Sequence, residues 1–184
     1  MFYCRLSRPP EWMMLHRTLL LVLFLIFGCT RNDVTETTTA EPELLPAPMS
    51  WPTFDEAVAT AAETDKLILI DIYAPWCGWC QKMQQEVYTD AALVAYVQDN
   101  FAYGRLNIDD AETRHDFWGH NLSSMELGYH LGAAGTPTTV FLGSDGSYIT
   151  KCPGYWAKDD FSLALRYVAT GAWQHTSFSE FSQF

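Results

Sequence analysis

The chain has 184 residues, 48% of them hydrophobic and 15% aromatic, and its formal net charge is −11. This hydrophobic content excludes a wholly disordered chain, and the length suits one domain with accessory segments. The acidic excess and the lack of any basic run argue against a nucleic-acid partner, because a phosphate backbone repels negative charge.

The first feature along the chain is an unbroken apolar run at residues 19–27, which follows Arg17. It is shorter than the ~20 apolar residues that a membrane-spanning helix requires. A basic start, a short apolar core and a small residue after it are typical of a secretory signal peptide. Residues 1–28 are therefore predicted to be removed on export, with Met13 or Met14 as an alternative start.

The segment that follows indicates a lipid anchor and a linker. Ile26-Phe27-Gly28-Cys29 resembles a bacterial lipobox, in which the cysteine is lipidated and becomes the new N-terminus. The resemblance implies a membrane-anchored lipoprotein that faces the periplasm or the cell exterior; the alternative is an ordinary signal peptide with an incidental cysteine. Residues 30–50 are rich in Thr, Glu and Pro, so 29–50 is predicted to be a lipidated cysteine followed by a disordered linker.

Residues 51–184 carry the hydrophobic periodicity of a folded domain. The pattern predicts, in chain order, a capped helix after Thr53, a buried strand at 67–74, a helix at 78–88, a helical stretch after Asp90, a strand at 101–108, a short helix after Ser123, a hairpin of strands 138–142 and 148–152, and a helix at 157–169. This order favours an α/β three-layer sandwich with helices on both faces of a central mixed sheet.

The cysteines indicate one reactive pair. An odd number with a single close pair does not resemble the disulfide framework of a small secreted protein. Cys77 and Cys80 lie at a predicted strand-to-helix junction, where the helix N-terminus lowers a thiol pKa. Cys77 is expected to attack a substrate disulfide, and Cys80 to resolve the mixed disulfide. The remaining cysteines are Cys4, Cys29 and Cys152.

Two motifs then resemble the thioredoxin family. Asp71-Ile-Tyr-Ala-Pro-Trp-Cys77-Gly-Trp-Cys80 resembles the thioredoxin active-site segment, with an acid six residues before the first cysteine. Gly135-Thr136-Pro137-Thr138 matches the loop in which thioredoxins place a cis-proline against those cysteines, and Gly154 matches too. The resemblance covers about 53–170. It implies the thioredoxin fold and disulfide exchange with protein substrates and a redox-recycling partner, without a cofactor, because the dithiol carries the electrons.

The resemblance also implies roles for individual residues. Cys77, Cys80 and Asp71 would be catalytic. Asp71 would be a buried proton acceptor for Cys80 with a raised pKa, or else a satisfied structural acid. The expected substrate-binding residues are Trp76, Gly78, Trp79, Thr136 and Pro137.

A narrower resemblance is to bacterial periplasmic thioredoxins associated with sulfur oxidation. Those proteins also insert residues before the helix that follows the third strand, here roughly 109–122, and end in a segment similar to 165–178. Trp79 replaces the proline common in cytosolic thioredoxins. Since residues between the cysteines tune the redox potential, the direction of exchange is open, with reduction expected.

Two alternatives from other classes remain for the cysteine pair. A copper or zinc carrier would use Cys77, Cys80 and a histidine, although a closed zinc site needs four ligands and no second Cys-x-x-Cys exists. The histidines considered are His115, His120 and His130. A non-catalytic interaction domain would keep the pair as a structural disulfide. Cys152 is expected to be a small buried hydrophobe.

Overall fold

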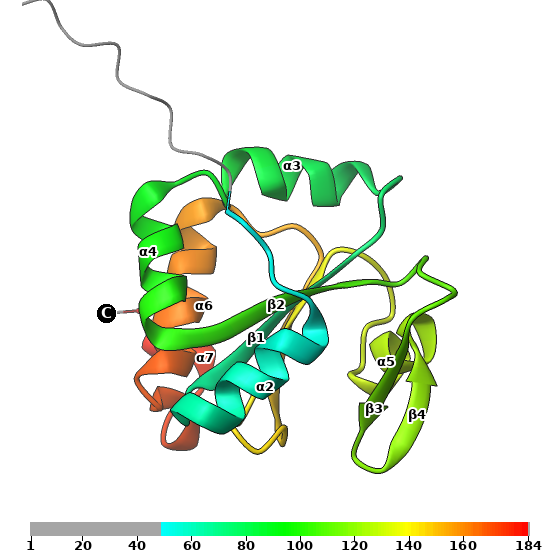
Figure 1. The fold of residues 1–184 in the computed structure, drawn as a ribbon. Coiled ribbons are helices and arrows are strands. Elements are labelled where there is room, and N and C mark those ends of the chain that lie inside the picture. Colours follow the sequence, from blue (N-terminus) through cyan, green and yellow to red (C-terminus); the bar gives the residue numbers. More distant parts are fainter. Residues whose placement is uncertain (1–48, 184) are drawn as a thin grey trace, which may run out of the picture. The chain divides into compact units, whose positions relative to one another are not determined.

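The computed structural model describes residues 49–183, so the predictions for the signal peptide and for Cys29 concern residues outside this range. Its centre is a four-stranded sheet with strand order β2-β1-β5-β6. The strands are β1 (Leu67–Tyr73), β2 (Phe101–Asn107), β5 (Thr138–Leu142) and β6 (Tyr148–Pro153) (Figure 1). β1 pairs in parallel with β2, while β5 is antiparallel to both β1 and β6. The sheet is therefore mixed, as predicted.

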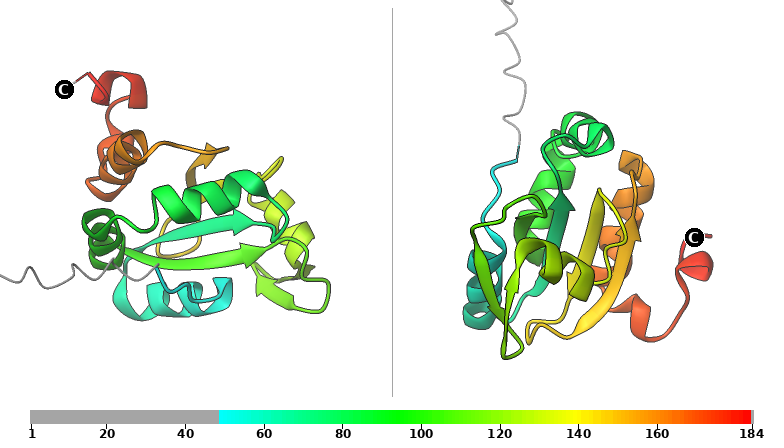
Figure 2. Two further views of the ribbon diagram at one scale, coloured as in Figure 1. Left: turned by 90° about the horizontal axis from the view of Figure 1, so that it is seen from above. Right: turned by 90° about the vertical axis from the view of Figure 1, so that its right-hand side faces the viewer.

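Helices cover both faces of this sheet, which confirms the predicted three layers. α2 (Phe54–Thr64) and α5 (Ser124–His130) pack on one face, and α3 (Gly78–Glu86), α4 (Ala91–Asn100) and α6 (Lys158–Ala169) on the other. The left view of Figure 2 shows the sheet between α2 and the layer that contains α3 and α6. Among residues 49–183, no helix combines the length and the apolar character needed to cross a membrane.

Strand β1 alternates between the two cores. Ile68, Ile70 and Ile72 are fully buried on the side of α2, while Leu69 is buried on the side of α3 and α6. Burial of each isoleucine contributes about 1.5–3 kcal/mol. Because side chains alternate along a strand, Asp71 faces the same side as Leu69. The acid therefore lies beneath α3, the helix that carries the cysteines.

A close helix–strand contact fixes the position of β2. A side-chain carbon at Gly104 would lie 2.5 Å from the carbonyl oxygen of Thr53 and 2.8 Å from Cβ of Ala57. Only glycine permits this approach of α2, which begins with the predicted capping box of Thr53 and Glu56. The backbone N–H of Arg105 then donates to the carbonyl of Pro52 over 2.8 Å. The register of β2 with β1 then pairs Arg105 with Asp71.

Three features differ from the sequence prediction. The insertion at 109–122 contains a hairpin of β3 (Arg114–Phe117) and β4 (His120–Ser123), whose four-residue strands are too short to give a clear pattern. Its turn places Trp118 at φ 49°, in the left-handed region where a tryptophan is unexpected. The helix predicted at 78–88 ends at Glu86, and short helices η2 (Ala172–Gln174) and α7 (Phe178–Phe181) follow α6.

Candidate active site

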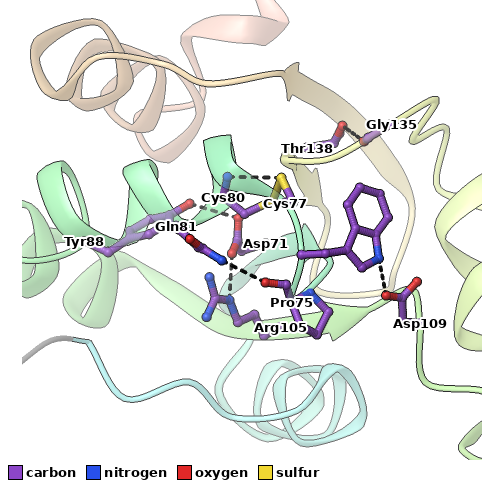
Figure 3. The surroundings of a disulfide bond; sticks show 11 residues. Asp71, Pro75, Cys77, Cys80, Gln81, Tyr88, Arg105, Asp109, Gly135 and Thr138 are labelled. Atoms are coloured by element: carbon purple, nitrogen blue, oxygen red, sulfur yellow. Dashed lines mark hydrogen bonds and ion pairs between the residues drawn. A yellow bond between two sulfur atoms is a disulfide. The ribbon is translucent and has the colours of Figure 1, made fainter.

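The two cysteines form a disulfide at the start of α3 (Figure 3). Cys77 is the N-cap of this helix, and its sulfur accepts a hydrogen bond from the backbone N–H of Cys80 over 3.1 Å. No acidic residue lies in the first turn of α3, so nothing there offsets the positive end of the helix dipole. When the bond is reduced, this environment favours the thiolate form of Cys77.

Aromatic side chains surround the disulfide. Cys77 and Cys80 are only 5% and 3% exposed, whereas Trp76 is 70% and Trp79 58% exposed. The Trp76 indole N–H donates to the Asp109 carboxylate, which ties this ring to the loop after β2. A side-chain carbon at Gly78 would meet no atom within 4 Å, so the space over the first residue of α3 is open.

The Trp79 ring is held by Tyr155 and Lys82 instead of by the loop after β2. Its ring lies 5.6 Å from that of Tyr155, and Nζ of Lys82 lies 5.3 Å from the Trp79 ring and 4.9 Å from the Tyr155 ring. The Tyr155 hydroxyl donates to Glu86 over 2.7 Å. Trp76 and Trp79 thus present two supported apolar surfaces beside the disulfide.

The predicted cis-proline is present at the Thr136–Pro137 bond. The carbonyl of Pro137 accepts a hydrogen bond from Gly154 over 2.8 Å, and the Thr138 hydroxyl donates to the Gly135 carbonyl over 2.7 Å. Ile108 packs against the cluster of Ala74, Cys77 and Cys80 and also lines, with Gly135 and Thr136, a small cavity of about 40 Å³. β5 begins directly after this proline at Thr138, which pairs with Ile72 near the end of β1, so the proline loop lies at the same end of the sheet as the cysteine pair.

Asp71 is buried, with 1% of its surface exposed, and both of its carboxylate oxygens have a partner. Nε of Arg105 donates to Oδ2 over 2.8 Å, and the Tyr88 hydroxyl donates to Oδ1 over 3.3 Å (Figure 3). Burial raises the pKa of Asp71, while the charge and hydrogen bond of Arg105 and the hydrogen bond of Tyr88 act against that rise. The net direction is upward, because the loss of solvation is the largest effect.

Sequence reasoning missed Arg105 and Tyr88. Arg105 is the direct neighbour of Asp71 in the β1–β2 register, and its guanidinium lies 4.1 Å from the Tyr73 ring and 5.0 Å from the Trp51 ring. A basic residue inside an otherwise apolar strand was a readable signal, because such a charge requires a partner. Tyr88 gave no such signal, since the pattern placed it in a helix that ends two residues earlier.

A model for a family described as a thioredoxin-like domain matches residues 54–169. The chain belongs to this thioredoxin-like family. The match includes both cysteines, Asp71 and the cis-proline loop. Residues 54–169 thus form a thioredoxin-type thiol–disulfide oxidoreductase domain, with Cys77 and Cys80 as its Cys-x-x-Cys pair.

Two curated relatives of this thioredoxin-like chain are distant in sequence. The thiol:disulfide interchange protein DsbD of Ralstonia nicotianae is 27% identical over 114 residues, which cover 61% of the chain and 17% of that protein. The DsbD of Tatumella citrea is 23% identical over 171 residues, covering 90% and 28%. The chain thus spans less than a third of the length of these curated relatives. A thioredoxin-fold protein from Helicobacter pylori superimposes with a TM-score of 0.57 at 24% identity, covering 65% of the chain and 79% of that protein.

The histidine proposed as a metal ligand and the third cysteine of this thioredoxin-like domain each have their own surroundings. His115 is buried between the Asp55 carboxylate, at 2.8 Å, and the Ser124 hydroxyl, at 3.0 Å. Within residues 49–183, no three His, Cys, Asp or Glu side chains are grouped to hold a metal ion, so the carrier alternative finds no ligand set there. Cys152 is unbonded and buried, as expected, and burial raises its pKa to about 12.

Proposed function

We propose that the protein is an exported thiol–disulfide oxidoreductase that exchanges disulfides with protein substrates through Cys77 and Cys80, chiefly as a reductase. The observation that carries the proposal is the disulfide at the N-terminus of α3, on the side of the sheet where Asp71 is buried. The relatives named thiol:disulfide interchange proteins support exchange with other proteins. Export rests on the signal-peptide pattern of residues 1–28.

The proposed exchange has two steps. In the reduced protein, the Cys77 thiolate attacks one sulfur of a substrate disulfide, forming a mixed disulfide and releasing the other substrate sulfur as a thiolate. Cys80 then loses its proton to Asp71 and attacks the Cys77 sulfur, which releases the second substrate thiolate. The substrate gains two electrons, the Cys77–Cys80 disulfide reforms, and a redox-recycling partner returns it to the dithiol.

The surfaces beside the disulfide suit a polypeptide substrate. Trp76, Trp79 and the open space over Gly78 offer apolar contact area, and we expect Thr136 and Pro137, on the loop at the same end of the sheet, to contribute to substrate binding. Flat aromatic surfaces bind varied peptide segments with little demand on sequence. The sequence resemblance to sulfur-oxidation thioredoxins adds that these substrates are extracytoplasmic proteins.

A redox titration tests the proposal. We expect the Cys77–Cys80 pair to equilibrate reversibly with glutathione or dithiothreitol buffers and the reduced protein to cleave insulin disulfides. A reduction potential near thioredoxin's, about −270 mV, is the expected result for a reductase, whereas about −120 mV would make the protein an oxidant. A pair that resists dithiothreitol under native conditions would instead be a structural disulfide and would overturn the proposal.

The proposed membrane attachment is tested separately. We expect the mature protein to begin at a diacylated Cys29 and to sediment with membranes, and Cys29→Ala to be soluble or unprocessed. Stable attachment needs more than one acyl chain, because a single chain binds a bilayer only reversibly. Mass spectrometry of the mature N-terminal peptide measures this directly, with Cys4→Ala as the control that leaves attachment unchanged. An unmodified peptide cleaved on either side of Cys29 would contradict the lipid anchor and leave a freely diffusing exported protein.

A further inference from the structure

We propose that Tyr88 is a positioning residue for this reaction, and that its hydroxyl holds the Asp71 carboxylate in the orientation from which it accepts the proton of Cys80. The inference rests on the proposed function, and in particular on Asp71 as the proton acceptor. It assigns to Tyr88 an effect on the resolving step alone.

The position of the Tyr88 hydroxyl is fixed by its surroundings. The residue is fully buried immediately after α3, where its backbone N–H donates to the carbonyl of Met83 over 3.1 Å and its carbonyl accepts from Met49 over 3.2 Å. Its ring meets the rings of Trp51 and Phe161 edge-on, at 4.7 and 5.8 Å. A ring held on both sides and at its backbone cannot swing, so its hydroxyl is a stationary donor.

Two donors from different elements hold the carboxylate. Arg105 of β2 bonds Oδ2, and Tyr88 bonds Oδ1, so the acid is held from both sides (Figure 3). With Arg105 alone, the carboxyl group could turn about its own bond. Arg105 and Cys80 also line one open cavity of about 180 Å³, which admits water between them. The arginine that bonds Asp71 therefore faces the same cavity as the resolving cysteine.

Packing alone does not explain why residue 88 carries a hydroxyl group. A phenylalanine would fill the same apolar space, whereas a buried hydroxyl costs free energy unless it is hydrogen-bonded. The hydroxyl lies 3.3 Å from Asp71 and 3.4 Å from the Thr139 hydroxyl. Burial, with the nearby Asp71 charge, raises the pKa of Tyr88 well above its usual range. Tyr88 consequently keeps its proton and stays a donor to the carboxylate throughout the pH range of exchange.

Stopped-flow reaction of the reduced protein with 5,5′-dithiobis(2-nitrobenzoate) separates the two steps, because each releases one coloured thiolate. We expect Tyr88→Phe to move the pH midpoint of the second phase upward by about 0.5–1 unit, since loss of one hydrogen bond disfavours the charged carboxylate. The first phase stays unchanged, and the second stays below the wild-type rate even at a pH where Asp71 is fully ionised, because the carboxylate is no longer held in place. Tyr103→Phe is the matched control, because it removes a tyrosine hydroxyl whose partner is Gln98.

A second measurement does not depend on activity. Carbon-13 NMR titration of the Asp71 carboxyl should show the same upward shift in Tyr88→Phe and none in Tyr103→Phe. Should Tyr88→Phe fail to fold, 3-fluorotyrosine at position 88 keeps the ring and makes its hydroxyl a stronger donor, so both midpoints should move downward.

The outcomes separate this inference from the proposed function. If Asp71→Asn slows the second phase but the Tyr88 substitutions leave both midpoints in place, the positioning role is wrong and the function stands. If Asp71→Asn leaves the second phase unchanged while exchange proceeds, Asp71 is not the acceptor and this inference falls with it. A reduced protein that shows no exchange overturns the function itself.

Discussion

The Cys80→Ser variant is expected to accumulate covalent complexes with its substrates, whereas Cys77→Ser should lose exchange down to the uncatalysed background. Cys77 is the N-cap of α3, where the helix dipole and the Cys80 N–H stabilise a thiolate. Cys80 lies inside the first turn, so it can attack only a sulfur already bonded to Cys77. Without that second thiol, the mixed disulfide has no internal route to release.

Non-reducing electrophoresis of tagged variants, produced with their export signal, measures the captured complexes. A Cys77→Ser/Cys80→Ser double variant should capture nothing, and Cys152→Ser should behave as the wild type because its thiol is buried and its pKa is raised to about 12. Complexes that form on Cys80 in the Cys77→Ser variant would reverse the assignment of the two roles.

Asp71→Asn is expected to slow resolution of the mixed disulfide by about 10²-fold while leaving its formation nearly unchanged. The size is that of a lost general base. An ionised Asp71 can accept the Cys80 proton and a protonated one cannot. Because burial raises the pKa of Asp71, the wild-type resolution rate should fall at a higher pH than an ordinary aspartate would give. This fall in the resolution rate on acidification should be absent in Asp71→Asn.

Stopped-flow rates for both phases, measured across the acid range, check this result. Asp99→Asn is a suitable control, since it makes the same chemical change at an exposed position of α4. Equal slowing of formation and resolution, or an unchanged acid limb, would remove Asp71 from proton transfer.

The sequence was most informative where a local physical signal was strong. Strand β1 was readable because a continuous apolar run at that length suits a strand covered on both faces. The α2 and α5 starts were readable because each capping box is a complete local motif, and both are formed as predicted. The cysteine pair and the cis-proline loop were recognisable by their resemblance to thioredoxins, and the structure contains both the disulfide and the cis bond.

The features that the sequence does not predict depend on contacts between residues that are distant along the chain. Arg105 meets Asp71 only through the register of β1 with β2, and Tyr88 reaches the same acid only because α3 ends at Glu86. The β3–β4 hairpin has four-residue strands and a tryptophan at positive φ in its turn. Neither the alternation of apolar and polar residues nor the residue preferences of hairpin turns therefore predicts it. In each case tertiary structure, rather than local propensity, decides the outcome.

The residues just before α2 contact the side chains that hold Asp71, so they belong to the redox-active domain. Trp51 packs against both Arg105 and Tyr88, Pro52 accepts the Arg105 N–H, and Met49 donates to Tyr88. The family match starts only at Phe54. A protein trimmed to that boundary would still contain both cysteines, the proline loop and the residues of every strand of the sheet. It would nevertheless open the Asp71 network to water, so the minimal redox domain is longer than the minimal fold.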